Sequence, residues 1–448
     1  DSFETVVVRP PQVLVEFGFV APGTIWRAVK AIYGLRISPK AWGVERDRQL
    51  RKMSIDVDGK KYIFHQSHID PSVWTVVRGR FIPEGVGVPI HEAFSPDNPD
   101  SEPLGYIVIY VDDFLISGSD AIRDKITEEI KRYWKITDKP GIAYGSGGSV
   151  EYLSVTVTAR SDGYFLSQST YAHDLLSKWQ MDESRPIGSL EDVPEDIQEE
   201  EEPQLDDVRK AQRLAGGLNW LATRTRPDLA FYVSQLASAA TKTPLRAIAL
   251  GKRCLRYLRG TTDHGIEMSD GSHHPQGGGR PEGRAEGLLH PQGGGRLEGF
   301  GDASYEEGWA QTGGIVKLNG NTICWKSSKQ PQVPRSTAEA ECTAMAYCSQ
   351  MVEGIVCLFH TMRVVIGRPT LYCDNRAAVH LSTGSNEWRT KALVNRILGV
   401  RSLIELGFLQ LLFKPTADME ADLLTKFMGQ KILSRQRHLV GCVPPRHA

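Results

Sequence analysis

Short apolar runs separated by turn residues predict β-hairpins over much of the first half of the chain. Two such runs, 106–111 and 114–116, are rich in β-branched and aromatic residues and flank a tight turn. Further along, 152–157 alternates between apolar and polar residues and predicts one strand, which a turn at 161–163 joins to a second strand at 164–167. Helical patterns are found at 121–134, at 171–179, just after Pro227 and at 246–259.

The last third of the chain has the clearest order of elements. Asn319 and Gly320 form a strong hairpin-turn signal between two predicted strands. Ser336 and Glu339 have the spacing of a capping box, and apolar residues then recur every three or four positions, so a long helix is expected to about Phe359. The predicted strands are 299–303, 312–318, 321–327, 370–373 and 409–413. The predicted helices are 336–359, one from Asn375, and 421–427.

Composition places the chain among ordinary globular proteins. Its 448 residues suffice for several domains, and 40% of them are hydrophobic and 24% charged. Because no apolar run approaches the roughly 20 residues of a membrane span and no signal peptide is visible, we expect no membrane partner. The seven cysteines are scattered singly, which indicates free thiols in a reducing compartment and no structural zinc site. Since the N-terminus lacks an initiator Met, we expect a fragment of a longer reading frame.

Charge is distributed unevenly behind a net charge of −1. The stretch 189–208 holds ten acidic residues and no basic one, which predicts a solvated loop. Residues 300–448 carry 17 Lys and Arg against 12 Asp and Glu, a net of +5 that is compatible with a phosphate-backbone partner. Lys252, Arg256 and Arg259 fall on one helix face, which either follows a phosphate backbone or is simply solvated.

A duplicated stretch separates the two halves of the chain. HPQGGGRPEG at 274–283 recurs as HPQGGGRLEG at 290–299. Two copies are too few for a solenoid, and the Gly and Pro content predicts a flexible linker without chemistry. A stretch that is not true coding sequence is the alternative.

Two adjacent aspartates, Asp112 and Asp113, lie at or beside the turn of the first hairpin. Neighbouring carboxylates repel each other unless a cation neutralises them. One interpretation is therefore a Mg²⁺ site for phosphoryl transfer, since hard cations prefer carboxylate oxygens. The other interpretation is a hairpin with an acidic, solvated turn.

Several segments, in order along almost the whole chain, resemble the Pol polyprotein of copia-type LTR retrotransposons. YVDD at 110–113 resembles the polymerase active-site hairpin of reverse transcriptases. AIYGLRISPKAW at 31–42 is similar to the family's LYGLKQSPRAW, with Ile37 in place of Gln. GGLNWLATRTRPDLAFYVSQL at 216–236 resembles a family segment built around ATRTRPD. DPSVW at 70–74 resembles the family's DPCLY.

The resemblance implies an α+β fold, a partial reverse-transcriptase palm and thumb, followed by an α/β RNase H-like domain with a five-stranded mixed sheet. The positions of the motifs and the changes in composition along the chain then give the boundaries between the expected parts. The expected parts are the palm and thumb at 1–188, an acidic loop at 189–208, a helical thumb or connection region at 209–270, the Gly/Pro-rich duplicated linker at 271–298, the RNase H-like domain at 299–429 and a C-terminal tail at 430–448.

The same resemblance implies an enzyme, an RNA-directed DNA polymerase and ribonuclease H that uses Mg²⁺, or Mn²⁺ as the alternative. The implied partners are an RNA template, a DNA primer, the RNA–DNA hybrid and dNTPs, in cytoplasmic virus-like particles or the nucleus. The implied catalytic and metal-binding residues are Asp112, Asp113, Asp302, Glu341, Asp374 and Asp422. The implied nucleic-acid-binding residues are Lys252, Arg256, Arg259, Tyr33 and Lys329.

Four of these carboxylates fall where an RNase H fold places its metal site. Asp302 ends the first strand of the domain, Glu341 lies on the long helix and Asp374 ends the fourth strand. Asp422 is expected near the start of the last helix. Taken singly, each has an ordinary explanation, such as a helix N-cap or a first-turn acid on a helix dipole. Together, and in the family's order, they predict a two-metal site.

Departures from the family pattern leave the activity open. The family's first polymerase aspartate lies upstream of the YGL segment, so Asp112 and Asp113 have no visible third partner and we expect little polymerase activity. Ala392 and Val394 replace a His and an Asp of the family, which predicts reduced RNase H activity. The alternative function is a catalytically inactive retroelement remnant that at most binds nucleic acid, and a non-expressed or misfolded relic is a further possibility.

Overall fold

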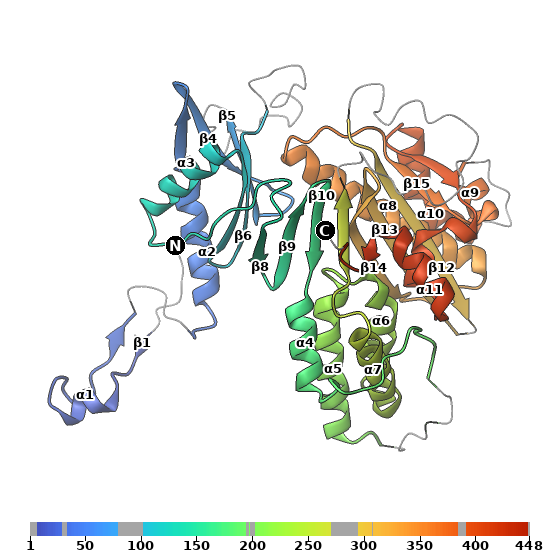
Figure 1. Ribbon diagram of the computed structural model, residues 1–448, viewed down its shortest axis with the longest axis horizontal. Helices are drawn as coiled ribbons and strands as arrows, with labels where there is room; N and C mark the ends of the chain where they lie inside the picture. The colour runs from blue at the N-terminus through green and yellow to red at the C-terminus, as the bar shows by residue number, and fades with distance from the viewer. Residues whose placement is uncertain are drawn as a thin grey trace. The chain divides into compact units, whose positions relative to one another are not determined.

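The computed structural model describes residues 7–28, 34–78, 102–193, 197, 202–269, 294–306, 308–383 and 391–446, with the side chains of 383 and 391–396 left out. The chain divides into two compact units. Unit 1 comprises Asp1–Asp138 with Leu358–Val364, and unit 2 comprises Lys139–Cys357 with Val365–Ala448. Figure 1 shows the elements of each unit in chain order by colour.

Unit 1 is built around a five-stranded antiparallel sheet whose strands follow one another in chain order. Its strands are β3 (Ser54–Val57), β4 (Lys60–Gln66), β5 (Val73–Arg78), β6 (Gly105–Tyr110) and β7 (Asp113–Gly118). The main helices are α2 (Ser38–Leu50) and α3 (Asp120–Lys131). Ile122, Ile126 and Ile130 repeat every four residues on α3 and pack into one core with Trp74 and Ile107 of the sheet.

The predicted hairpin at 106–116 and the helix after it are confirmed by β6, β7 and α3. A small ribbon precedes the sheet in the chain. It consists of β1 (Val7–Val8), α1 (Gln12–Glu16) and β2 (Trp26–Arg27). Strands β1 and β2 pair antiparallel.

Unit 2 contains a second five-stranded antiparallel sheet, in the order β17-β11-β10-β9-β8. Its strands are β8 (Ser149–Tyr152), β9 (Val155–Arg160), β10 (Gly163–Ser167), β11 (Gly265–Ser269) and β17 (Cys442–Val443). The prediction of one strand over 152–157 is wrong, because Leu153 and Ser154 have φ of 53° and 60° and form a tight turn between β8 and β9. Apolar and polar residues alternate in both strands and across the two-residue turn between them. The period-2 pattern therefore cannot reveal the turn.

Four helices form the next part of unit 2, and the predicted helices at 171–179 and 246–259 are confirmed. They are α4 (Ser169–Lys178), α5 (Leu205–Ala222), α6 (Ala230–Ala239) and α7 (Pro244–Arg259). A short 3₁₀ turn, Pro227–Leu229, precedes α6. The fully buried Arg226 and Asp228 form a bidentate pair, with Nε and Nη2 donating to the two carboxylate oxygens at 2.9 and 2.8 Å. Tyr257 of α7 donates a further hydrogen bond to Asp228, at 2.7 Å, and ties the helices together.

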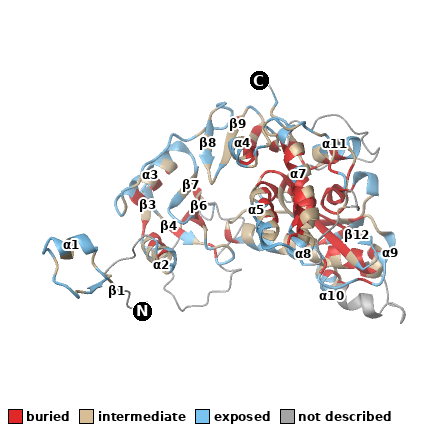
Figure 2. Ribbon diagram, turned by 90° about the horizontal axis from the view of Figure 1, so that it is seen from below, coloured by how far each residue is buried: buried red, intermediate tan, exposed pale blue. Residues whose placement is uncertain are grey.

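The predicted five-stranded mixed sheet is confirmed in the last part of unit 2, in the order β14-β13-β12-β15-β16. Its strands are β12 (Leu297–Glu306), β13 (Trp309–Leu318), β14 (Asn321–Lys329), β15 (Thr370–Cys373) and β16 (Gln410–Phe413). Strands β12, β13 and β14 pair antiparallel, whereas β15 is parallel to both β12 and β16. Its helices are α8 (Thr337–Thr361), α9 (Arg376–Thr383) and α10 (Lys391–Glu405). Figure 2 shows most of β12 buried, as is much of α7.

Helix α8 begins as its sequence predicts and lies close against the sheet. The backbone N–H of Glu339 donates to Ser336 Oγ at 3.2 Å, and the Glu339 carboxylate accepts from the backbone of Arg335. A Cβ added to Gly299 would lie 2.7 Å from Val352, so only glycine permits this approach of helix to strand. By length and composition α8 could also cross a membrane, a test that core helices of soluble proteins pass as well.

The C-terminal region differs from its prediction in two places. The expected helix at 421–427 is wrong, because Glu420–Leu424 is a 3₁₀ turn that lies directly on the sheet. A Cβ at Gly313 would meet the carbonyl of Ala421 at 2.9 Å, and tertiary packing of this kind overrides local helix propensity. Helix α11 (Gln430–Leu439) occupies the stretch expected as a tail. Its buried residues are only Leu433 and Gln436, which is too weak a pattern to predict it.

Candidate metal centre

Two neighbouring parallel strands place the first two carboxylates beside each other. Phe300 of β12 pairs with Tyr372 of β15. Because side chains on a strand repeat every second residue, Asp302 and Asp374, two residues further on, lie at matching positions on the same face. The register of the sheet therefore brings together aspartates that are 72 positions apart in the sequence.

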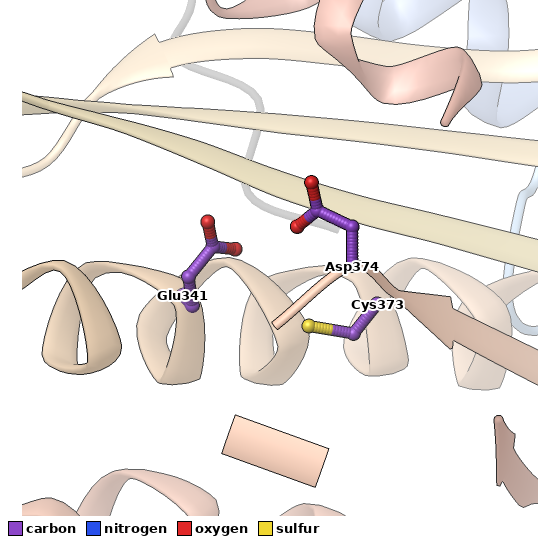
Figure 3. A group of neighbouring side chains, drawn as sticks. All are labelled: Glu341, Cys373 and Asp374. Atoms are coloured by element: carbon purple, nitrogen blue, oxygen red, sulfur yellow. The ribbon is translucent and has the colours of Figure 1, made fainter. Parts of the chain in front are cut away.

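Helix α8 and the 3₁₀ turn Glu420–Leu424 supply the other two carboxylates. Ligand oxygens of Asp302, Asp374 and Asp422 all lie within 4.8 Å of one another. A second group, Glu341, Cys373 and Asp374, meets the same limit, so Asp374 is common to both. Figure 3 shows the second group, with Glu341 on α8 and the other two residues at the end of β15. The four predicted carboxylates thus form one cluster.

Burial and mutual repulsion make this cluster electrostatically costly. Asp302 is 1% exposed and Glu341 is 4% exposed. Burial, followed by the charges of Asp302 and Asp374, raises the pKa of Glu341 to about 9. Burial also raises the pKa of Asp302 to about 7, with Lys426 opposing the shift and Asp422 adding to it. Two carboxylates in one buried site would each favour a bound proton or a nearby cation.

The donor set suits a divalent cation. Oδ1 of Asp302 and Oε2 of Glu341 are buried and have no hydrogen-bond partner among the described residues. Unpaired buried carboxylate oxygens are destabilising unless a cation or donor satisfies them. Clustered carboxylate oxygens are the ligands that hard divalent ions prefer.

Three side chains that the sequence analysis missed hold the aspartates in place. Thr425 donates a hydrogen bond from Oγ1 to Asp302. Lys426 donates to Asp422, and its Nζ lies 3.7 Å from Asp302 Oδ2. Thr416 donates to Asp374 Oδ2 at 2.7 Å. Thr425 and Lys426 come three and four residues after Asp422 in ADLLTK, so their place in that motif was the available signal.

Sequence comparison identifies the relatives of this chain. It is 28% identical over 454 residues to the retrovirus-related Pol polyprotein from transposon RE2 of Arabidopsis thaliana, and the match covers 99% of this chain and 27% of that protein. It is 23% identical over 455 residues to the corresponding polyprotein from transposon TNT 1-94 of Nicotiana tabacum, covering 98% of this chain and 30% of the relative. Its homologues over nearly the whole chain, at 23–28% identity, are thus retrovirus-related Pol polyproteins of transposons. The chain spans roughly a quarter to a third of the length of these relatives. No protein-family model matches it.

Comparison of this chain with solved structures returns RNase H1 proteins. The crystal structure of RNase H1 from Halobacterium salinarum is 19% identical and covers 29% of this chain and 95% of its own, with a TM-score of 0.24. LC11-RNase H1 in complex with an RNA/DNA hybrid is 16% identical, covers 29% of this chain and 94% of its own, and also has a TM-score of 0.24. Scores of this size do not establish a common fold.

The aspartates of the first hairpin belong to unit 1, whereas the carboxylate cluster belongs to unit 2. Asp113 pairs with Tyr110 across the hairpin, and Asp112 occupies the turn, where both aspartates are exposed. Trp42 and Arg46 of α2 donate to the turn carbonyl of Val111 at 3.0 and 2.8 Å. Val111 has a φ of 55°, which is strained for a β-branched residue. Within the described part of the chain, neither aspartate joins a group of three ligating side chains.

The basic residues predicted to contact nucleic acid are of two kinds. Lys252 and Lys329 are exposed. Arg256 and Arg259 instead donate from Nε to the backbone carbonyls of Arg185 and Asp182, at 2.9 and 2.5 Å. These two arginines therefore fix a loop beside α7. Tyr33 lies outside the described residues.

A groove of about 570 Å³ lies between α5, α6 and β14 of unit 2. Polar and small side chains line most of it, and Lys326 and Lys329 supply positive charge. Ser327 in this groove donates to the carbonyl of Leu424 at 2.6 Å. Leu424 ends the 3₁₀ turn that carries Asp422, so the groove adjoins the segment that supplies one of the carboxylates.

Proposed function

We propose that this Pol segment hydrolyses the RNA strand of RNA–DNA hybrids, as a ribonuclease H that depends on Mg²⁺ or, alternatively, Mn²⁺. One observation carries the proposal: Asp302, Glu341, Asp374 and Asp422 converge from separate elements with two of their buried oxygens unpaired. The order of strands around them, and the ADLLTK and YCDN segments that contain two of them, support the same assignment.

The residues of the cluster have separable roles. Asp302, Asp374 and Asp422 would hold one divalent ion, and Asp374 with Glu341 would hold a second. When bound, such ions activate water and neutralise charge on the phosphate that is attacked. Thr425 and Lys426 orient Asp302 and Asp422, and the hydrogen bond from Thr416 fixes Asp374.

We further propose that the hairpin of Asp112 and Asp113 belongs to a polymerase site of the longer polyprotein. In that context its partners would be an RNA template, a DNA primer and dNTPs. Its turn is held rigidly, because Trp42 and Arg46 both donate to the carbonyl of Val111. A fixed, strained turn with exposed carboxylates is consistent with presenting them to a ligand.

One assay tests both activities at once. The substrate is a labelled RNA–DNA hybrid with a recessed primer, incubated with Mg²⁺ and dNTPs, and the control is Asp302→Asn. RNA cleavage that the control abolishes, without primer extension, is the expected result. Cleavage that persists in Asp302→Asn would overturn the assigned site, and primer extension would show that the hairpin acts within this segment.

A catalytically inactive remnant that still binds nucleic acid is the second candidate. Two substitutions favour this second candidate, because Ala392 and Val394 replace a His and an Asp of the copia-type family that the chain resembles. The side chains of Ala392 and Val394 are not among those that the structure describes. Hybrid affinity that falls with salt, without turnover in Mg²⁺ or Mn²⁺, would support this candidate over the nuclease.

A further inference from the structure

A thiol, that of Cys373, lies at one edge of the carboxylate cluster. Mg²⁺ binds oxygen ligands, so a Mg²⁺ site alone does not explain a thiol in this position. Cys373 ends β15, is fully buried, and has its Sγ within 4.8 Å of ligand oxygens of both Glu341 and Asp374. Figure 3 shows the sulfur pointing to the side on which Glu341 lies. The backbone N–H of Asn375 donates weakly to this sulfur, at 3.4 Å.

An unpaired oxygen in the same place indicates that a ligand belongs there. Oε2 of Glu341 is buried and has no hydrogen-bond partner among the described residues, and the residue is 4% exposed. Asp374 is only half-buried, so one of the three side chains is in contact with solvent. One sulfur atom and two carboxylates thus meet at one point, and the Asp374 side of it is partly exposed.

We propose that Cys373, Glu341 and Asp374 form a binding site for a thiophilic divalent ion, Zn²⁺ or Cd²⁺, with water in the fourth position. Mg²⁺ takes oxygen ligands in near-octahedral geometry and makes little use of sulfur. Zn²⁺ accepts sulfur and oxygen together in tetrahedral geometry, with bonds of about 2.3 Å to sulfur and about 2.0 Å to oxygen. Such ligands lie roughly 3.5 Å apart around the ion, so small side-chain rotations close the observed site.

Metal binding releases the thiol proton of Cys373 and, below about pH 9, also the proton that Glu341 holds in the metal-free protein. The S–H bond of Cys373 breaks, the sulfur electron pair forms the bond to the ion, and the proton passes to solvent. No oxidant or reductant takes part. Because Glu341 and Asp374 are common to both sites, a thiophilic ion would exclude Mg²⁺ from this part of the cluster and inhibit the proposed nuclease.

The test uses the whole chain and Cd²⁺ as the probe. Thiolate bound to Cd²⁺ gives an ultraviolet charge-transfer band, which is independent of any enzymatic activity. We expect a band that saturates at one Cd²⁺ per chain, disappears in Cys373→Ser and persists in Cys357→Ser, which removes the exposed thiol of α8. Zn²⁺ affinity measured by calorimetry should fall at least tenfold in Cys373→Ser.

A second measurement guards against a variant that fails to fold. The ¹¹³Cd NMR shift of the wild-type chain should indicate a single sulfur ligand with oxygens, and Glu341→Gln should weaken Cd²⁺ binding while keeping the band. A band that survives in Cys373→Ser, or that is lost in Cys357→Ser, would overturn the proposal. If Cd²⁺ binds as expected but no hybrid is cleaved, the site stands and the proposed nuclease falls.

Discussion

Among the carboxylates of the cluster, Glu341 has the pKa that burial raises furthest. Its pKa is raised from 4.5 to about 9, chiefly by burial, so the folded protein holds the proton more tightly than the unfolded chain. Its contribution to stability is therefore complete below about pH 4.5 and is lost as the pH rises towards 9. Asp302, with a pKa raised to about 7 by burial, acts in the same direction. Urea unfolding in EDTA should show a loss on the order of 2–4 kcal/mol between about pH 5 and pH 9.

Glu341→Gln is the matched control for this pH dependence. The amide keeps the shape of the side chain and carries no charge, so the metal-free variant should be more stable than the wild type at about pH 8. Near pH 5 the two proteins should be similar, because Glu341 is then protonated in the folded state. A wild-type stability that stays flat or rises over this range would contradict the proposed repulsion.

Lys426 supplies a positive charge inside the cluster, where a metal ion would also supply it. Its Nζ lies 3.7 Å from Asp302 and donates to Asp422, so it competes with a divalent ion for both aspartates. We expect Lys426→Met to destabilise the metal-free protein near pH 8 and to tighten Mg²⁺ binding roughly tenfold, as measured by calorimetry. Lys431→Met, which alters an exposed lysine of α11, is the control. Weaker Mg²⁺ binding in Lys426→Met would show that the lysine's positioning of the aspartates outweighs its competition with the ion.

Three carboxylates of the cluster were predicted on recognisable elements, and Asp422 was predicted from its place in the ADLLTK motif although its expected helix is a 3₁₀ turn. Asp302, Glu341 and Asp374 lie on a strand, a helix and a strand end whose patterns are clear in the sequence. Cys373 and Lys426 were not selected, because their relevance depends on sheet register and on packing between distant segments. Neither property is encoded in the spacing of residues along one element.

At the scale of elements, the buried pair of Arg226 and Asp228 holds the helices of unit 2 together. The guanidinium lowers the pKa of Asp228 far below its usual range despite burial, and Tyr257 completes the network. Asp228→Asn would leave Arg226 buried without an opposing charge, so we expect a loss of about 3–5 kcal/mol in urea unfolding. Asp206→Asn on α5 removes an exposed carboxylate and should cost less than about 0.5 kcal/mol. Equal effects of the two variants would contradict a structural role for the buried pair.

Elements were predictable where their own residues determine them. The turn at Asn319 and Gly320, both with positive φ, and the cap at Ser336 are encoded locally, and the structure has both. The turn at Leu153 and Ser154 lacks the usual turn residues and was missed. The conformation of segment 421–427 is determined by its contact with Gly313, so its helical pattern of residues predicted a helix that the structure does not have.

At the scale of the whole molecule, the proposed nucleic-acid partner requires a surface that binds phosphates. The groove between α5, α6 and β14 contains Lys326 and Lys329. Each lysine that contacts a phosphate releases about one counterion, so the slope of log affinity against log salt reports how many contacts are lost. We expect the double variant Lys326→Ala/Lys329→Ala to bind hybrids of any nucleotide sequence more weakly and to reduce the magnitude of this slope by about 1–2.

The basic face of α7 is the alternative binding surface for the hybrid. Single variants on α7 distinguish this face from the groove. Arg256 holds the carbonyl of Arg185, so Arg256→Ala should lower stability more than it lowers hybrid affinity. Lys252 is exposed on the same helix, and Lys252→Ala tests the face without disturbing that loop. Fluorescence anisotropy with a labelled hybrid at several salt concentrations measures each slope. If Lys252→Ala reduces the slope and the double variant in the groove does not, the hybrid lies along α7 and the groove has no part in holding it.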